Sequence, residues 1–542
     1  MRHRMLCLSI ALFGCADPSA SDGPAETGST QPGDGDGDPT GDGDPSGDGD
    51  PSGDGDGDEP KFDLGAVLDG GPLGPIDAIP ETCSEAEQFE MTVGCRFYAV
   101  DLDNYTPWDA SQYGVAVANV QQDQVATVLV EVNEDGSWQS IAGPQQIAAK
   151  DLHVFELPDR HQEGSGVYLG GAYRITADVP VIAYQFGPLG TDMDVAWASA
   201  DASMLYPAPA WDTVNHVVGM ISTSHLLPQQ GAYVTVVAAH DGTVVTITPS
   251  VATLAGDGVP AGVAGVPFEV ELDEGDIVEV MTKTQGESLT GTRVTSNADH
   301  PVGVFSAHEC ANIPADVYAC DHLEEQLPGV SRWGTQFVAA RMPVRVAPNQ
   351  PPEPSLWQIY ASEDDTQITL TASPAITGLP PSPLILDAGE LIEFLATGEP
   401  GDPGDFLVSA DKPIAVANYM TSQDSITVAG KTGDPAMVML SPIEQFLPRY
   451  VVLVPSAWPT DKATFTRRVG SVVTIDGVAI PDDQWIPVGL EFEVARVVLA
   501  DGVYLLEGDE PFAVAISGTH NTGSYAYLGG TSTAVINPDP VG

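Results

Sequence analysis

Residues 173–186 read YRITADVPVIAYQF, an Asp-x-Pro sequence between two runs of residues that favour β-strands. The same arrangement returns three times, in TRVTSNADHPVGVF (292–305), DFLVSADKPIAVANY (405–419) and YLLEGDEPFAVAIS (504–517). Proline has no amide hydrogen to donate to a β-ladder, so we expect a turn at each Asp-x-Pro and a strand that begins at the proline. The four aspartates are Asp178, Asp299, Asp411 and Asp509.

Two further landmarks keep the same order between copies. LDEGDIVE (272–279) matches LDAGELIE (386–393), and DGTVVTI (241–247) matches DDTQITL (364–370). Matches at a regular period indicate internal repeats, each of about six strands in roughly a hundred residues. The sequence therefore predicts an all-β region over residues 61–542 with four tandem repeats, built as β-sandwich-like modules. A closed propeller-like array of the repeats is the alternative.

The charge of the chain excludes one class of partner. The 542 residues carry 77 acidic and 19 basic side chains, a net charge of −58. Residues 33–60 hold eleven of the acids, so the acidity is spread over the whole chain. Such a charge repels nucleic acids and anionic lipid headgroups, and it favours cations and basic partners.

The first 60 residues have the composition of a leader and a spacer. Arg2 and Arg4 precede a run of ten apolar residues, MLCLSIALFG, and Cys15 follows it. This pattern is typical of a lipoprotein-type signal peptide over residues 1–15, with Cys15 as the lipidation site. Residues 16–60, rich in Gly and Asp, cannot bury a core, and we expect a disordered spacer. Its Asp-x-Asp repeats lack the glycine and glutamate of an EF-hand loop, so we expect no specific calcium site there.

The cysteines agree with export. Beyond the leader the chain has two close pairs, Cys83 with Cys95 and Cys310 with Cys320. Close pairs in an exported chain favour disulfides, and local pairing is the simplest of three possible connectivities.

The segment HECANIPADVYACDHLEEQLPG (308–329) concentrates histidine, cysteine and acidic residues. It is one of three irregular inserts that follow the Asp-x-Pro strands, and we interpret these inserts as connecting loops. A zinc site of Cys310, Cys320 and the two histidines is the alternative to a disulfide, but the spacing fits no zinc-binding motif. If the repeats close on themselves, the ends of the inserts lie on one face, and we expect a polar binding surface of His308, Asp321, His322 and His520.

Several of these stretches resemble a known family. They are CSEAEQFEMTVGCRFYAVDLDN (83–104), DASMLYP (201–207) and HECANIPADVYACDHLEEQLPGVSRWGTQF (308–337). Together they resemble the N-terminal domain of IgGFc-binding protein, which is also found in myxobacterial surface lipoproteins, and the resemblance covers nearly everything after the spacer. It implies an extracellular binding or adhesion module with no catalytic role.

No hydrolase, metalloprotease or phosphate-binding motif is present in the sequence. We therefore expect no enzyme activity, no cofactor and no metal. The function we expect is a cell-surface or secreted binding and adhesion protein that recognises an extracellular protein or glycan through loops of its β-repeats. It would be held at the outer membrane or cell surface by a lipid, or be secreted. The alternatives are a structural component of an outer-surface or matrix assembly and, more distantly, an extracellular polymer hydrolase.

Overall fold

The computed structural model describes residues 79–541 except 107, 190–198, 223–230 and 457. The chain divides into two compact units, 1–66 and 67–542, and every described residue lies in the second. The expected leader, the lipidation site Cys15 and the spacer are therefore outside the described residues. Within those residues, no helix has the length and apolar character needed to cross a membrane.

The prediction of an all-β fold is confirmed. Strands form most of the described regular structure, and α1 (Cys83–Phe89) is the α-helix of the described ranges. Thr82 caps α1 because its hydroxyl accepts a hydrogen bond from the Glu85 amide, while the Glu85 carboxylate accepts one from the Thr82 amide. Short 3-10 turns follow several strands: η2 (Ala208–Ala210), η3 (Val330–Arg332), η4 (Gln423–Ser425), η5 (Ile443–Gln445) and η6 (Asp482–Gln484).

The strands of the described residues form five antiparallel sheets. The first contains β1 (Gly94–Val100), β2 (Gly114–Asn119), β3 (Ala126–Glu134), β4 (Ser137–Ile147), β5 (Leu152–Glu156), β7 (Ala172–Gly187) and β8 (Asp201–Met204). The second contains β6 (Gly166–Tyr168), β10 (Ala232–Ala238), β13 (Ile277–Met281), β15 (Val302–Ala311) and β16 (Asp321–Gln326). The third contains β9 (Val214–His216), β11 (Thr243–Thr248), β12 (Phe268–Leu272) and β14 (Arg293–Ser296).

The two remaining sheets have the strand order of the first, and the last of them adds β28 beside β29 at one edge. One contains β17 (Gly334–Ala339), β18 (Ser355–Ala361), β19 (Thr366–Ala372), β20 (Leu384–Leu386), β21 (Leu391–Ala396), β22 (Phe406–Met420) and β23 (Ala436–Met439). The other contains β24 (Leu447–Val454), β25 (Asp461–Arg468), β26 (Val473–Ile475), β27 (Val478–Ala479), β28 (Ile486–Val488), β29 (Phe492–Leu499), β30 (Gly502–His520) and β31 (Gly523–Leu528).

Each Asp-x-Pro of β7, β22 and β30 lies inside one long strand, so the expectation of a turn with a new strand at the proline is wrong for these three. The first half of β7 pairs with β1 and β3, and its second half pairs with β2 and β8, so the sheet curls at this point. At this bend the aspartate connects β7 to β3, because Asp178 Oδ1 accepts the Thr127 amide of β3 at 2.6 Å. Asp411 and Asp509 accept the amides of Gln367 and Val472 in the same way.

In the second copy the expected turn does form, between β14 and β15, and it divides the strands into two sheets. The residue that accepts the neighbouring strand's amide is Asn297, bonded to Val244 at 2.9 Å, and not the expected Asp299. Asn297 stands four residues before Pro301, whereas Asp178 stands two before Pro180. The two additional residues close a turn from the Asn297 carbonyl to the His300 amide, which explains the break.

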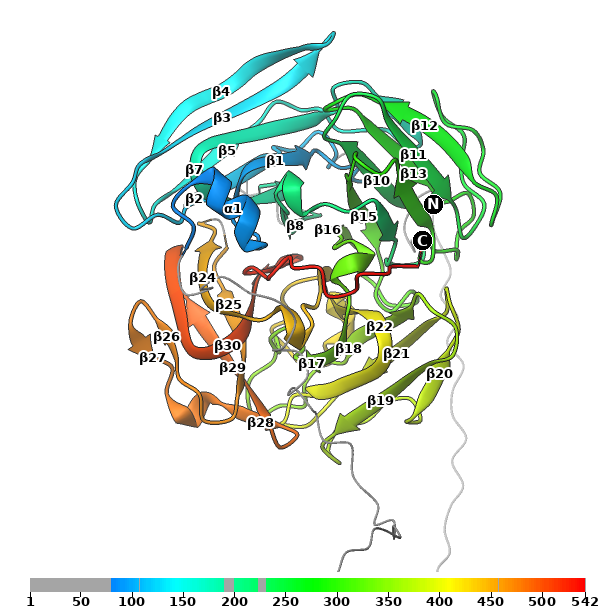
Figure 1. Cartoon of the computed structure of the whole chain (residues 1–542). Coiled ribbons are helices and arrows are strands. Elements are labelled where there is room, and N and C mark those ends of the chain that lie inside the picture. The colour runs from blue at the N-terminus through cyan, green and yellow to red at the C-terminus, as the bar shows by residue number, and fades with distance from the viewer. Residues whose placement is uncertain (1–78, 107, 190–198, 223–230, 457, 542) are drawn as a thin grey trace, which may run out of the picture. The chain divides into compact units, whose positions relative to one another are not determined.

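The innermost strands close a ring. β8 contacts β16 and β31, and β23 also contacts β16 and β31. Figure 1 shows β8 and β16 towards the inside and β4, β12, β20 and β27 at the periphery. One hydrophobic core joins the first and last copies and another joins the second and third. The copies are thus curled sheets whose inner strands meet in a closed ring, as in the propeller-like alternative.

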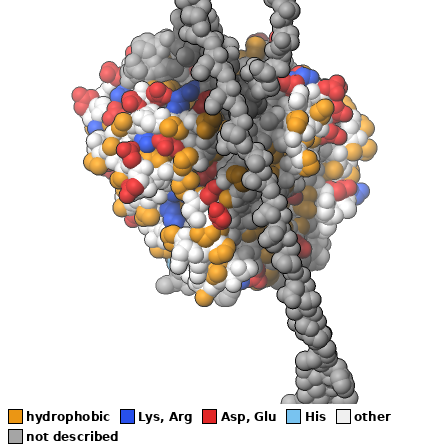
Figure 2. Space-filling view, turned by 90° about the horizontal axis from the view of Figure 1, so that it is seen from below, with side chains coloured by type: hydrophobic (Ala, Val, Ile, Leu, Met, Phe, Trp, Pro, Cys, Tyr) orange, Lys and Arg blue, Asp and Glu red, His pale blue; other side chains and the backbone are white. Residues whose placement is uncertain are grey.

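Exposed apolar side chains are spread over different elements. Leu169, Val478 and Leu490 are 78%, 71% and 88% exposed. The face in Figure 2 shows acidic and hydrophobic side chains interspersed. Scattered apolar residues of this kind are ordinary for a protein surface, and none of them indicates a binding site alone.

Candidate functional site

The segment with the concentrated histidines and cysteines is a β-hairpin. Residues 308–311 end β15, and 321–326 form β16, the inner strand of the second copy. The expectation that the insert is a connecting loop is therefore wrong for its second half. The predicted disulfides are confirmed, since Cys310 is bonded to Cys320 and Cys83 to Cys95. Because each thiol is used in a disulfide, neither Cys310 nor Cys320 is available as a zinc ligand.

His308 is a buried core residue and not part of a surface. It is 1% exposed, and its two ring nitrogens lie within hydrogen-bond distance of the Ile221 carbonyl at 3.1 Å and of the Cys310 amide at 3.0 Å. The amide must donate and the carbonyl must accept, so the ring is the neutral form with its proton on Nε2. Burial lowers the pKa of His308 to about 3, in agreement with this neutral form.

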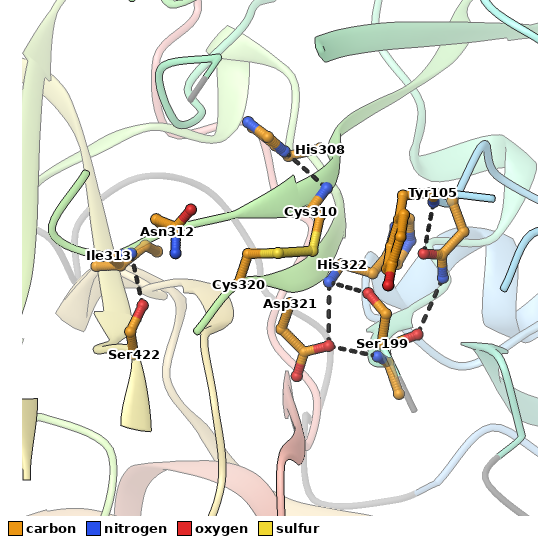
Figure 3. Close-up of a disulfide and its surroundings, with 12 residues drawn as sticks. Tyr105, Ser199, His308, Cys310, Asn312, Ile313, Cys320, Asp321, His322 and Ser422 are labelled. Atoms are coloured by element: carbon orange, nitrogen blue, oxygen red, sulfur yellow. Dashed lines mark hydrogen bonds between the residues drawn. A yellow bond between two sulfur atoms is a disulfide. The ribbon is translucent and has the colours of Figure 1, made fainter. Parts of the chain in front are cut away.

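Asp321 and His322 are also completely buried, so the expected polar surface of these residues is corrected. Asp321 Oδ1 accepts the Ala200 amide at 2.7 Å, and the His322 amide donates to the Ser199 hydroxyl at 2.7 Å (Figure 3). Burial raises the pKa of Asp321 well above its usual range. Both residues thus join β16 to the segment just before β8. His520, at the end of β30, is half-buried and lies apart from these contacts.

Between the inner strands of the ring, hydrogen bonds from backbone amides to buried polar side chains take the place of a regular β-ladder. Asp201 makes the largest set of contacts: its carboxylate accepts the amides of Met437 on β23 and Ala526 on β31, both at 3.1 Å, and of Glu324 on β16 at 3.3 Å. Burial, followed by the charge of Glu324, raises the pKa of Asp201, and the amide donors oppose that rise. One side chain therefore connects all four inner strands.

Glu325 and Gln326 on β16 act in the same way. Glu325 accepts the Met439 amide at 3.1 Å, and Gln326 accepts the Tyr206 amide at 2.7 Å. No motif or spacing in the sequence marks Asp201, Glu325 or Gln326 as important residues. The available signal was their position in the DASMLYP and CDHLEEQLP stretches, where the family resemblance is strongest.

The Trp-Gly pair after β16 is structural as well. Trp333 is buried, and its indole donates to the Pro328 carbonyl at 3.2 Å. A Cβ atom on Gly334 would lie 2.5 Å from the Cβ of Pro442, so no larger residue fits there. Trp211 and Trp357 are buried too.

The exposed part of this region is the set of tips at one end of the inner strands. The Ile313 amide donates to the Ser422 hydroxyl at 2.9 Å (Figure 3), and the Asp424 amide donates to the Tyr318 carbonyl at 3.0 Å. The Gly433 amide donates to the Asn521 carbonyl at 2.7 Å. We call residues 314–319, 423–432 and 520–522 the tip face. It brings together three copies and includes His520, but neither His308 nor His322.

The tip face offers mixed chemistry to a partner. Tyr318 is 49% exposed, and Asp316 beside it is exposed. Lys431 pairs with Asp424 at 2.6 Å, with both side chains partly in solvent. An aromatic ring among polar and charged groups is the composition found at protein-binding and glycan-binding surfaces.

The family model described as IgGFc binding protein matches residues 201–518, which run from the start of β8 into β30. The chain belongs to the IgGFc-binding protein family. The matched range begins at Asp201, the residue that connects the inner strands.

A human protein named IgGFc-binding protein is 28% identical to this chain over 346 residues. The alignment covers 63% of this chain and 6% of the human protein, so the chain spans a small part of that relative. No solved structure matches the chain. The IgGFc-binding family is thus shown by sequence.

The second disulfide of this IgGFc-binding family member gives a testable expectation. Replacing Cys310 and Cys320 together by serine should lower the free energy of unfolding by about 2–3 kcal/mol, because the reduced chain gains the entropy of an open ten-residue loop. Urea unfolding measures the difference. A reductant should lower the stability of the double variant only through the remaining Cys83–Cys95 bond. An unchanged midpoint in the double variant would show that the disulfide adds nothing.

Proposed function

We propose that this protein is an exported, non-catalytic binding protein, and that an extracellular protein or glycan docks on the tip face. The observation that carries the proposal is the convergence of tips from three copies at one end of a rigid ring, joined by backbone hydrogen bonds and anchored by the Cys310–Cys320 disulfide. Exposed loops fixed by a rigid scaffold are the usual place for binding in β-proteins. Family membership and the two disulfides support binding outside the cell.

The partner is a separate part of the proposal. The human relative is named for binding IgG Fc, and that fragment is therefore one probe to test. The net charge of −58 favours a partner with basic groups. We propose adhesion at the cell surface as the role, with the chain held by a lipid on Cys15. Incorporation of labelled palmitate into the wild type, and its loss in Cys15→Ala, is the expected result for the anchor.

Three probes test the tip face: immobilised human IgG Fc, a glycan array and the purified chain itself. We expect binding to Fc or to a glycan, and we expect Tyr318→Ala combined with Asp316→Lys to weaken it about tenfold or more by removing an aromatic contact and reversing a charge. The matched control is Ile385→Ala on β20, which removes a side chain that is 64% exposed but outside the tip face.

Each result has a definite reading. Weaker binding in the tip variant with unchanged binding in Ile385→Ala supports the proposal, provided that both variants keep the wild-type unfolding midpoint. Equal binding by all three proteins overturns the tip face as the site. Recognition of the chain by itself, with no binding to Fc or to any glycan, overturns the ligand-binding function in favour of an assembly component.

A further inference from the structure

Two loops of the first sheet bring metal-binding side chains together, away from the tip face. Asp109 lies in the loop between β1 and β2, and His161 and Glu163 lie in the loop between β5 and β6. One ligand atom from each of the three residues lies within 4.8 Å of the other two. A group of one imidazole and two carboxylates from separate loops is a set that a single metal ion can bridge.

The imidazole is oriented for this purpose. His161 Nδ1 lies 2.5 Å from the Asp159 carboxylate, and its Nε2 lies 3.6 Å from Glu163 Oε1. A histidine that donates one ring N–H to a carboxylate presents its other nitrogen as a lone pair, and this is the usual arrangement of histidine ligands of metals. Asp159 is therefore the residue that positions His161.

Backbone contacts hold the two loops in register. The Arg160 amide donates to Asp101 at 2.8 Å, and the Gly164 amide donates to Asp103 at 2.9 Å. These bonds fix the loop on either side of His161 and Glu163. On the other loop, Asp109 is 9% exposed, and its oxygens accept the Ala110 amide and the Thr106 hydroxyl. The Glu163 side chain, 73% exposed, is the most exposed of the three.

The surroundings have an excess of negative charge. Glu279 on β13 is completely buried, its Oε1 has no hydrogen-bond partner, and burial, followed by the charges of Asp103 and Glu309, raises its pKa well above the usual range. A buried carboxylate without a partner is costly unless a cation compensates it. The acidic groups beside the two loops therefore favour a cation over an anion at this place.

We propose that Asp109, His161 and Glu163 bind one divalent transition-metal ion of the zinc class. Imidazole nitrogen favours zinc over calcium or magnesium, and carboxylate oxygens complete the set. Three protein ligands leave at least one coordination position for water or for a donor group of a partner. The site departs from the sequence-based expectation of no metal, because its residues are separated by about fifty positions and form no spacing motif.

The test uses the full chain after removal of metals with EDTA, titrated with Zn²⁺ by calorimetry and with Co²⁺ by visible absorption. We expect one site per chain, visible bands from Co²⁺ that Zn²⁺ abolishes, and a higher melting temperature with Zn²⁺. His161→Ala and Glu163→Gln should each weaken binding about tenfold or more. Glu156→Gln, which changes another exposed glutamate nearby, is the matched control and should bind as the wild type does.

The variants also separate this site from weak binding by acidic segments elsewhere in the chain. Unchanged affinity in both His161→Ala and Glu163→Gln would overturn the proposal, because the ion would then bind elsewhere. Absence of Zn²⁺ binding would overturn it as well. If Ca²⁺ displaced bound Co²⁺ as readily as Zn²⁺ does, that result would contradict the assigned metal class. Glu163→Gln changes an exposed side chain, so a folding defect cannot account for its effect.

Discussion

Asp201→Ala is expected to lose about 3–5 kcal/mol of unfolding free energy, because buried amides on three other strands lose their acceptor together. A single unsatisfied buried donor costs about 1–3 kcal/mol, and partial relaxation of the ring limits the sum. The loss is measured by urea unfolding at neutral pH. Such an effect is large for one side chain that lies in no hydrophobic cluster.

Two further variants make the result specific. Asp123→Ala removes an exposed aspartate and should change stability by less than about 0.5 kcal/mol. Asp201→Asn should be nearly as damaging as Asp201→Ala, because each carboxylate oxygen accepts amide hydrogens and the new NH₂ group would oppose them. An Asp201→Ala protein as stable as the wild type would show that the ring does not depend on this residue.

Asp101→Asn is expected to become more stable, relative to the wild type, as the pH rises. Asp101 is 4% exposed, and burial raises its pKa to about 7, with a smaller contribution from Asp159. A carboxyl group with a raised folded pKa contributes stability that is complete below its unfolded pKa of 3.8 and is lost as the pH rises through the folded value. At about 1.4 kcal/mol per pH unit, the loss is about 4 kcal/mol over the whole range.

Asparagine keeps an oxygen that accepts the Arg160 amide, but it does not ionise. The substitution therefore removes only the pH-dependent part of the contribution that Asp101 makes to the free energy of unfolding. Urea unfolding of both proteins in EDTA at several values between pH 5 and pH 8 should show their difference changing by roughly 3 kcal/mol. Asp123→Asn, which alters an exposed aspartate, should show no such change. A constant difference between wild type and Asp101→Asn across this range would contradict the raised pKa.

The sequence was sufficient for the fold class and the disulfides. Alternating Val, Ile and Thr predicted strands correctly because that pattern reflects burial of one face, which is a local property. Cysteine pairs ten and twelve residues apart predicted their own bonds for the same reason. The role of Asp-x-Pro was misread because a proline inside a long strand is tolerated only at a bend, and the bend depends on which strands pair with each half.

The candidate site was harder to predict because its partners are distant in the chain. The β16 sequence DHLEEQ has no apolar alternation and indicates an exposed segment, yet all six residues are buried. Some of their polar atoms accept amides from other copies, as Asp321 Oδ1 accepts the Ala200 amide, 121 residues away. Others, such as both ring nitrogens of His322, are buried without a hydrogen-bond partner. No local pattern records such contacts. The tip face and the proposed metal site likewise depend on loops that meet only in the folded protein.

Closure of the ring also limits the order in which the contacts of the folded protein can form. Asp201 accepts the amide of Ala526, which lies 325 residues later in the chain. The Thr531 amide likewise donates to the Thr92 hydroxyl across 439 residues. Contacts so far apart in sequence form slowly, since a long loop must close before they stabilise anything. The ring therefore cannot close before its last strand has been synthesised. Until β31 has been synthesised, β8 and β23 each lack one of the two neighbours that they contact in the closed ring.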